Sequence, residues 1–214
     1  MIRFDDIKYD YDDLNEIVSK LKYDPNTDQI NIDFFEAKSI LDNYFSDDEV
    51  LWLVGQRFIE APAAVKYHGN YKGGLFIHSL LVGLELENLT RKLDLKWANK
   101  KSPMRIGLLH DICKTDDYKF GFVNTYDNEL DKSVKQFQIS YNNNKKYEGH
   151  GDKSVIMLSG HININEQEKI CIIYHMGAFT DKDKWSDYSR SCNKEPNVLY
   201  THTADMIASQ VRGV

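Results

Sequence analysis

The chain has 214 residues, of which 42% are hydrophobic and 28% charged, as in a globular protein with one sizeable core. Its formal net charge of -6 leaves no overall positive field to hold duplex nucleic acid through its phosphates. No run of 18 apolar residues is present and the segment from Met1 to Asp13 is rich in aspartate, so we expect neither a membrane span nor a signal peptide.

The first 60 residues are expected to form helices that pack on the rest of the chain. Apolar residues at helical spacing predict helices at residues 12–22, 34–45 and 47–60. Asp33 can cap the second of these helices. The third begins at Ser46-Asp47-Asp48-Glu49, which has the sequence of a capping box.

The centre of the chain contains a polar loop followed by two apolar helices. The loop, at residues 61–74, carries aromatic, basic and histidine side chains, and residues 75–93 then form a long and densely apolar helical pattern. Ser102 followed by Pro103 is a cap with a first-turn proline, and we expect the next helix to begin there and to lead into His110.

Alternating aromatic and polar residues predict a two-stranded hairpin at about residues 118–141. Helical patterns follow at residues 154–158, at 165–175 and from 196 onwards, with a polar loop expected at 178–194. We therefore predict a mainly α protein, a single helical bundle with one β-hairpin insert.

The sequence His110-Asp111-Ile112-Cys113-Lys114 ends an apolar run in a cluster of chemically active groups. A buried imidazole beside a buried carboxylate is costly to leave without a partner, and a metal ion is the commonest partner. On a helix, Lys114 would lie near both Asp111 and His110. The pentapeptide therefore predicts the centre of a metal site.

Further histidines and one carboxylate lie within apolar helical patterns. His78 and His175 fall within or at the end of such patterns, and Asp205 is an acid inside an apolar helix. Each alone is more often a hydrogen-bonded structural residue, but their convergence on one or two cations would explain them together. Nitrogen and oxygen ligands of this kind suit zinc, manganese, iron, nickel or magnesium.

The cysteines are not needed in this ligand set, and none is well placed in the sequence to join it. Cys113, Cys171 and Cys192 are odd in number and lack the spacing of a metal or disulfide motif. We therefore expect reduced thiols and a cytoplasmic protein.

In chain order, His78, His110-Asp111 and Asp205 resemble the H...HD...D signature of the HD-domain metal-dependent phosphohydrolase superfamily. The residues from His110 to Lys114 match its HD-x-x-K form, and those from Gly73 to Ser79 are similar to its GGL-x-x-HS entry to the first ligand helix. The resemblance covers about residues 61–209. It implies an HD domain at 61–214, on which residues 1–60 pack to make one globular unit.

Two further elements resemble the extra histidine sites of members that hold two metals: Gly149-His150-Gly151 and His175-Met176-Gly177. The resemblance implies one metal on His78, His110, Asp111 and Asp205, and a second held by Asp111, His150 and His175. The cofactor would be one or two divalent ions (Mn, Fe, Zn, Ni or Mg). Cys113 stands where the family usually has glycine, and Met176 stands where some members have another histidine.

The function that the resemblance implies is a metal-dependent phosphohydrolase or phosphodiesterase. Its substrate would be a nucleotide, a cyclic nucleotide or a short oligonucleotide, attacked by a metal-activated water. The pattern is most similar to bacterial HD-type exoribonucleases and cyclic-dinucleotide phosphodiesterases, and to uncharacterised HD proteins of bacteria and their phages. Two alternatives are a di-iron HD-type oxygenase and a non-catalytic nucleotide-binding module. The expected partner is a small phosphate compound, with no membrane and no duplex nucleic acid.

Catalytic roles are assigned to Asp111 and Lys114. Lys114 would stabilise the charge of the phosphoryl group rather than transfer a proton. Its alternative role is that of a lysine paired with Asp111, Asp116 or Asp117.

The loop before His78 is a candidate for substrate binding. We predict that Lys66, His68 or Lys72 contacts the substrate phosphate, and that Tyr67 or Tyr71 stacks on a base. The alternative is a solvated loop without a role in binding. Two histidines, His161 and His202, match no family position and are expected to be structural, although His202 lies three residues before Asp205 and could support a ligand.

Overall fold

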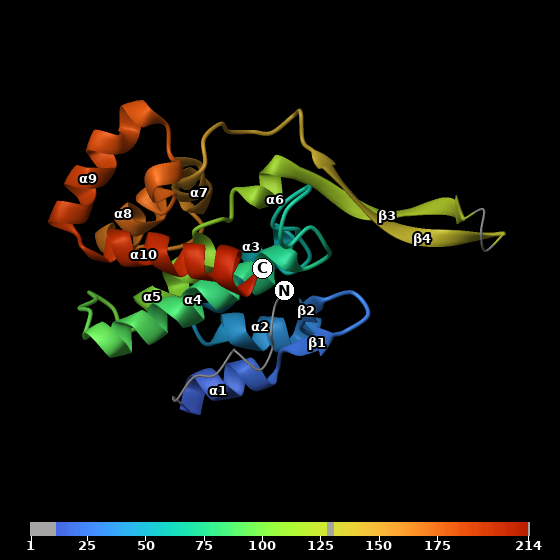
Figure 1. Ribbon diagram of the computed structural model, residues 1–214, viewed down its shortest axis with the longest axis horizontal. Coiled ribbons are helices and arrows are strands. Elements are labelled where there is room, and N and C mark those ends of the chain that lie inside the picture. The colour runs from blue at the N-terminus through green and yellow to red at the C-terminus, as the bar shows by residue number, and fades with distance from the viewer. Residues whose placement is uncertain (1–11, 128–130, 214) are drawn as a thin grey trace.

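The computed structural model of the protein describes residues 12–127 and 131–213. Within these ranges the chain is mainly α-helical, with two small antiparallel two-stranded sheets (Figure 1). The mainly α fold with a β-hairpin that the sequence predicts is therefore confirmed. The expectation of no signal peptide concerns residues 1–13, and the first 11 of these lie outside the described residues.

Within the described part of the chain, no helix is both long enough and apolar enough to cross a membrane.

The N-terminal region contains three helices and a short hairpin. Its elements are α1 (Asp12–Ser19), β1 (Lys22–Asp24), β2 (Gln29–Asn31), α2 (Phe34–Asp42) and α3 (Asp47–Gly55). The predicted caps form, because the Asp33 side chain accepts a hydrogen bond from the Phe35 amide and the Ser46 capping box is complete. Helix α3 ends at Gly55 instead of near residue 60, because Arg57 adopts a left-handed φ of 59° that stops the helix.

Two apolar helices form the centre of the molecule: α4 (Gly74–Leu93) and α5 (Ser102–Leu109). The residues of α4 from Gly74 to Leu86 are all buried. The two helices cross unusually closely at Gly83 and Gly107, since a Cβ atom at Gly107 would lie 2.2 Å from the Gly83 nitrogen. This crossing brings the first half of α4 against the end of α5.

The predicted hairpin follows the short helix α6 (Lys114–Asp117) and consists of β3 (Tyr118–Asp127) and β4 (Lys132–Tyr141). Its strands pair antiparallel from Tyr118 opposite Tyr141 to Asp127 opposite Lys132. The hairpin projects from the helices as a long ribbon (Figure 1). Its polar tip was expected at residues 126–132, of which 128–130 lie outside the described residues.

The C-terminal region is helical. Its main elements are α7 (Gly151–Leu158), α8 (Glu166–Tyr174), α9 (Trp185–Lys194), α10 (Asn197–Met206) and a π-helical segment (Ile207–Arg212). The prediction of a loop at 178–194 is wrong for its second half, which forms α9. Its inward-facing residues Tyr188 and Cys192 pack against the core, but they stand among eight other residues of which seven are polar, so the apolar pattern is sparse in the sequence.

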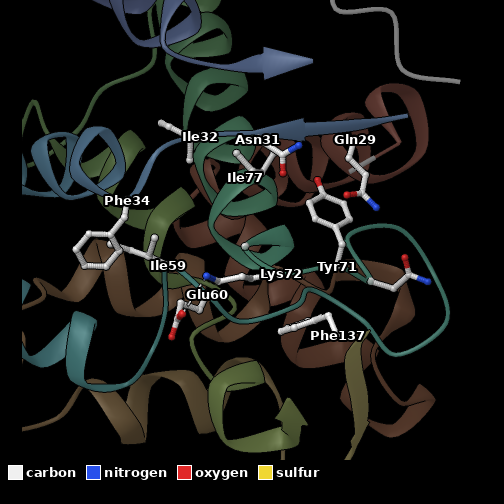
Figure 2. Close-up of a pocket in the computed structure, with 12 residues that line it drawn as sticks. Gln29, Asn31, Ile32, Phe34, Ile59, Glu60, Tyr71, Lys72, Ile77 and Phe137 are labelled. Carbon is white, nitrogen blue, oxygen red and sulfur yellow. Dashed lines mark ion pairs between the residues drawn. The ribbon is translucent and has the colours of Figure 1, made fainter. Parts of the chain in front are cut away.

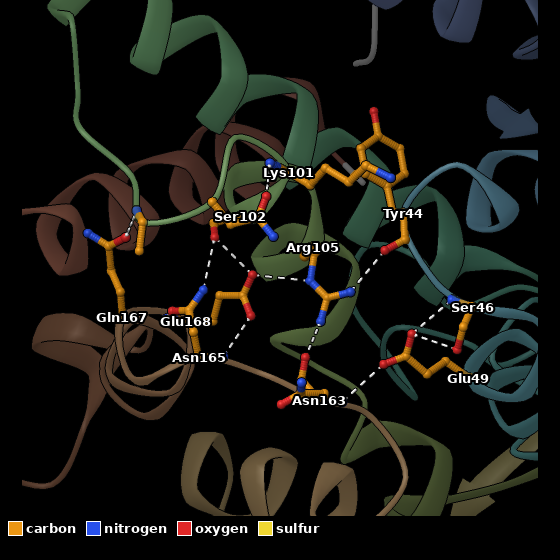
Figure 3. A network of polar contacts seen from close by, with 12 residues as sticks. Tyr44, Ser46, Glu49, Lys101, Ser102, Arg105, Asn163, Asn165, Gln167 and Glu168 are labelled. Atoms are coloured by element: carbon orange, nitrogen blue, oxygen red, sulfur yellow. Dashed lines mark hydrogen bonds and ion pairs between the residues drawn. The ribbon is translucent and has the colours of Figure 1, made fainter.

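A buried polar network joins the N-terminal helices to α5 and α8 (Figure 3). The Arg105 guanidinium pairs with Glu168 at 3.1 Å and donates to the carbonyls of Tyr44 and Asn163. Ser102 donates to the same Glu168 carboxylate at 2.9 Å. The Arg105–Glu168 pair thus links three parts of the chain. The predicted domain boundary at residue 60 stays a prediction.

Candidate metal centre

Four helices bring histidine and aspartate side chains together. His78 lies in α4, His110 caps the end of α5, His175 caps the end of α8, and Asp205 lies in α10. The ring centroids of His78 and His110 are 5.3 Å apart, and those of His110 and His175 are 4.8 Å apart. Residues widely separated in the sequence therefore form one compact cluster.

The rings of His110 and His175 are oriented by backbone carbonyls. Each Nδ1 donates a hydrogen bond to the carbonyl three residues earlier, at 2.8 Å for His110 and 2.7 Å for His175. A carbonyl can only accept, so Nδ1 carries the proton and Nε2 of the neutral ring keeps a lone pair. Burial lowers the pKa of His110 to about 3, which keeps this ring neutral.

Three buried atoms of the cluster have no hydrogen-bond partner among the described residues: His110 Nε2, His175 Nε2 and Asp111 Oδ1. Both imidazoles are 0% exposed, so bulk water does not reach them to form hydrogen bonds. Buried polar groups in folded proteins are nearly always paired. A cation bound between these atoms would pair with their lone pairs.

The two oxygens of Asp111 face different histidines. Oδ2 lies 3.6 Å from His78 Nε2 and 3.5 Å from His110 Nε2. Oδ1 lies 2.9 Å from His150 Nε2 and 3.5 Å from His175 Nε2. The contact of Oδ1 with His150 is a close ion pair. Asp111 thus lies between two pairs of imidazoles.

The Lys114 ammonium lies 2.6 Å from Asp111 Oδ2, so the ion pair offered by the sequence as an alternative role for this lysine is formed. Burial alone would raise the pKa of Asp111, but Lys114 and the neighbouring imidazoles lower it well below its usual value. The same pairing raises the pKa of Lys114 against the effect of its burial. Both groups therefore stay charged at neutral pH.

Asp205 completes the arrangement on the side of His78. Its Oδ1 lies 3.3 Å from His78 Nε2. Burial opposes ionisation, but the contact with His78 and the nearby imidazoles lower the pKa of Asp205. A second carboxylate is therefore available to a cation beside His78.

The spacing of these atoms fits metal binding. Two ligand atoms that each lie about 2.1 Å from one cation are about 3.0 Å apart at 90° and about 3.4 Å apart at the tetrahedral angle. The nitrogen to oxygen distances in the cluster run from 2.9 to 3.6 Å. The buried histidine, aspartate and cysteine groups could hold a metal ion.

His150 reaches the cluster from the N-terminal end of α7. A Cβ atom at the next residue, Gly151, would lie 2.4 Å from the carbonyl oxygens of Ile172 and Ile173, so this glycine lets α7 approach α8 closely. The rings of His150 and His175 are consequently 5.1 Å apart. Burial lowers the pKa of His150, but the Cys113 sulfur and the Asp111 carboxylate outweigh it and raise this pKa to about 11.

Helix α7 is tied to the pentapeptide by a buried lysine. Lys153 is 0% exposed, and its ammonium lies 2.7 Å from both Asp116 and Asp117. Asp116 and Asp117 therefore form ion pairs with Lys153, and Lys114 forms its ion pair with Asp111. The clamp fixes α6 relative to the helix that begins after His150.

A cavity of about 230 Å³ opens beside the cluster. The predicted residues that line it are His68, His78, Asp111, Lys114, His150 and Asp205. Burial lowers the pKa of His68, whose ring lies 5.7 Å from that of His78. Of the residues proposed to bind substrate, His68 is therefore placed at the cluster.

The other proposed loop residues lie elsewhere. Tyr71 and Lys72 line a separate pocket of about 490 Å³ (Figure 2). The Tyr71 hydroxyl donates to the carbonyl of Ile30, and the Lys72 ammonium pairs with Glu60 at 3.2 Å. Lys66 and Tyr67 are exposed and are not among the residues that line either cavity.

Several residues of the site were not found from the sequence. The cavity is also lined by Met176, Phe179, Met206, Ser209 and Gln210. Met206, Ser209 and Gln210 follow Asp205, and their closeness in the sequence to this candidate ligand is the signal that could have identified them. The expectation that no cysteine is well placed is wrong for Cys113, whose sulfur lies 3.5 Å from His150 Nδ1.

The two remaining histidines do not join the cluster as candidate ligands. His202 donates from Nδ1 to the carbonyl of His175 at 2.8 Å and so supports the backbone of a candidate ligand. His161 stacks on Trp52, with ring centroids 4.9 Å apart.

Comparisons of the chain with models of protein families, with curated proteins and with solved structures find no match.

Proposed function

We propose that the protein is a metal-dependent phosphohydrolase or phosphodiesterase of the HD type. The observation that supports this most directly is the position of Asp111, whose two oxygens each face a different pair of imidazole nitrogens. Two of those nitrogens carry buried lone pairs without a hydrogen bond from the described residues. A bridging carboxylate between two sets of nitrogen ligands is the arrangement of a two-metal hydrolase.

The ligands divide into two groups. His78, His110, Asp205 and Asp111 Oδ2 would hold one cation, and His150, His175 and Asp111 Oδ1 would hold the other. This set, rich in imidazole, suits manganese, iron, nickel or zinc better than magnesium, which prefers oxygen ligands and retained water. When bound, such ions lower the pKa of water and polarise phosphoryl oxygens.

Lys114 supplies a fixed positive charge at the cavity wall. Its side chain is only 13% exposed and its raised pKa keeps it protonated. A group that holds its proton so firmly is a poor acid, so its contribution is electrostatic: it stabilises the negative charge that gathers on a phosphoryl group in the transition state. This charge also offsets the overall negative charge of the chain for an anionic substrate.

The size of the cavity favours a small ester. At about 230 Å³ it is below the usual range of pockets that enclose whole ligands, about 300–1,000 Å³. It would take the phosphate and the adjoining atoms, and the rest of the substrate would extend past His68 and Phe179. Phe179 is 66% exposed, which suits a contact with a nucleoside or another aromatic group.

The proposal is tested by metal analysis of the purified protein, followed by a phosphate-release and nuclease screen with added Mn²⁺. Nucleoside monophosphates, cyclic nucleotides and short single-stranded oligonucleotides are the substrates to compare. The double variant His110→Ala with Asp111→Ala should lose bound metal and activity, while His161→Gln serves as a histidine control outside the cluster.

Three results would contradict the proposal. Activity that survives in the double variant would show that the cluster is not the active site. Iron content with oxygen consumption would indicate an oxygenase, and tight nucleotide binding without turnover would indicate a binding module.

A further inference from the structure

We propose that Cys113 is a positioning residue for His150: its sulfur accepts a hydrogen bond from Nδ1–H and thereby directs Nε2 towards Asp111 Oδ1. The inference depends on the metal centre of the proposed function but not on the reaction that takes place there. It assigns a role to the one residue of the pentapeptide that the family resemblance leaves unexplained.

Two other imidazoles that face Asp111, those of His110 and His175, obtain their orientation from the helices that carry them. His110 and His175 each lie at a helix C-terminus, where a carbonyl three residues earlier is free to accept from Nδ1. His150 precedes the first turn of α7, where free amides and not free carbonyls are found. Its ring therefore needs an acceptor from another part of the chain.

Cys113 provides that acceptor. Its sulfur lies 3.5 Å from His150 Nδ1, while the other ring nitrogen, Nε2, lies 2.9 Å from Asp111 Oδ1. A cation bound at Nε2 requires the ring proton to be on Nδ1. Because a thiol sulfur accepts a hydrogen bond only weakly, burial of the pair matters for its strength.

The sulfur is held firmly in this position. Cys113 is 0% exposed, and its backbone amide donates to the Ser154 hydroxyl of α7 at 3.3 Å. Cys113 is thus hydrogen-bonded to α7, the helix that begins immediately after His150. The Lys153 clamp between α6 and α7 fixes the same two segments.

Direct ligation by the sulfur is the alternative to a positioning role. Asp111, Cys113 and His150 are close enough for all three to bind one ion. However, the nitrogen nearest to the bridging carboxylate is Nε2, and the sulfur contacts Nδ1. The contact of the sulfur with Nδ1 supports the positioning role, and the Co²⁺-loaded protein distinguishes this role from ligation.

The experiment compares the variants Cys113→Ala and Cys113→Ser with Cys171→Ala, which removes an equally buried thiol elsewhere. Calorimetric titration of the metal-free proteins with Zn²⁺ measures affinity at each position. Cys113→Ala should weaken one of the two binding events about 10- to 100-fold, as loss of a supporting hydrogen bond does. Cys113→Ser should recover much of this loss, and Cys171→Ala should bind as the wild type.

A spectroscopic measurement reports the orientation itself. In the zinc-loaded protein labelled with ¹⁵N-histidine, the His150 ring should show a proton on Nδ1, and this signal should be lost or exchange-broadened in Cys113→Ala. A role limited to packing would lower the melting temperature without moving either the zinc affinity or this signal.

The outcomes separate the two proposals. Unchanged zinc affinity in Cys113→Ala overturns the inference whether or not the protein hydrolyses phosphates. A sulfur-to-cobalt absorption band in the Co²⁺-loaded protein that disappears in Cys113→Ser would also overturn it, by showing that the sulfur is a ligand. A Cys113 effect on zinc binding in a protein without phosphohydrolase activity would uphold the inference and contradict the proposed function. A wild type that binds no Zn²⁺ would overturn both.

Discussion

Asp111 is the residue whose geometry limits what the cluster can do. Burial of a carboxylate is costly, and here four imidazoles and one ammonium lie within 3.6 Å of its oxygens. Because the two oxygens serve different neighbours, a change at this side chain would affect both halves of the centre at once.

We expect Asp111→Asn to abolish binding of both metal ions, because an amide nitrogen replaces one ligand oxygen and the remaining oxygen is a weaker, neutral donor. His175→Ala should remove only one ion, since the Asp111 oxygen that its Nε2 contacts, at 3.5 Å, is Oδ1. Metal content per chain by atomic spectroscopy distinguishes the two. Asp94→Asn, at an exposed carboxylate, is the control. One retained equivalent in Asp111→Asn would show that this carboxylate does not bridge.

Replacement of Lys114 by methionine should separate binding from catalysis. Removal of the ammonium at 2.6 Å frees Oδ2, so metal affinity should stay the same or increase. The turnover number should fall about 100-fold, because a positive charge at the transition state is lost. Lys145→Met is a matched control, since Lys145 forms an exposed ion pair of the same length with Glu148. An equal loss in both variants would argue against an electrostatic role for Lys114.

Some residues of the site are visible in the sequence and others are not. His78, His175 and Asp205 are polar residues in apolar helical patterns, and their cost of burial indicates a shared partner. His150 has no such pattern and was found only through the family resemblance. The contact of Cys113 with His150 and the cavity wall at Phe179 depend on how α7 and the segment after α8 pack, which local sequence does not encode.

At the scale of elements, the approach of α4 to α5 decides whether His78 and His110 can meet. At the crossing, Gly83 and Gly107 leave no room for a side chain on α5. The two imidazoles depend on this contact, because His78 lies five residues before Gly83 and His110 lies three residues after Gly107.

The variant Gly107→Ala should therefore lower stability and metal affinity together. Its Cβ would lie 2.3 Å or less from the Gly83 backbone, so the helices must separate, at a cost of about 1–3 kcal/mol. The melting temperature should fall by roughly 2–4 °C for each kcal/mol in a chain of this size. Gly55→Ala, where the added atom meets nothing within 4 Å, should be neutral or slightly stabilising. A Gly107→Ala protein as stable as the wild type would show that the crossing is not tight.

The elements that the sequence predicted share strong local signals. Caps at Asp33 and Ser46, and the Ser102-Pro103 start, identified helix beginnings that the structure places within a residue or two. The β1–β2 hairpin was missed because strands of three residues are too short to show alternation. Helix α9 was missed because its one face of Trp185, Tyr188 and Cys192 is sparse among polar residues.

At the scale of the whole molecule, a buried carboxylate lies where the N-terminal helices meet the bundle. Glu87 of α4 is partly buried, and its burial together with the nearby Asp13 of α1 raises its pKa to about 7. Burial of Tyr44, together with the negative charge of Glu87, raises the pKa of the Tyr44 hydroxyl to about 12. The attachment of the first helix to the bundle is therefore sensitive to pH.

Stability should fall as the pH rises towards and through about 7. The pKa of Glu87 is higher in the folded protein than the ordinary 4.5, so the folded state holds this proton more tightly than the unfolded chain does. That stabilisation is complete below about pH 4.5 and is lost as the pH passes about 7. Urea unfolding midpoints at pH 5 and pH 8 should differ less in Glu87→Gln than in the wild type. An identical difference in both proteins would contradict this assignment.

The ligands of the cluster are spread from residue 78 to residue 205, and this separation bears on how quickly the protein folds and unfolds. Contacts between such distant segments form late, after the entropy of closing long loops has been overcome. A cation that needs all four helices in place would therefore bind after the folding transition state. Added metal should slow the unfolding rate of the protein and leave its folding rate almost unchanged. Stopped-flow unfolding with and without Zn²⁺ would measure this kinetic protection.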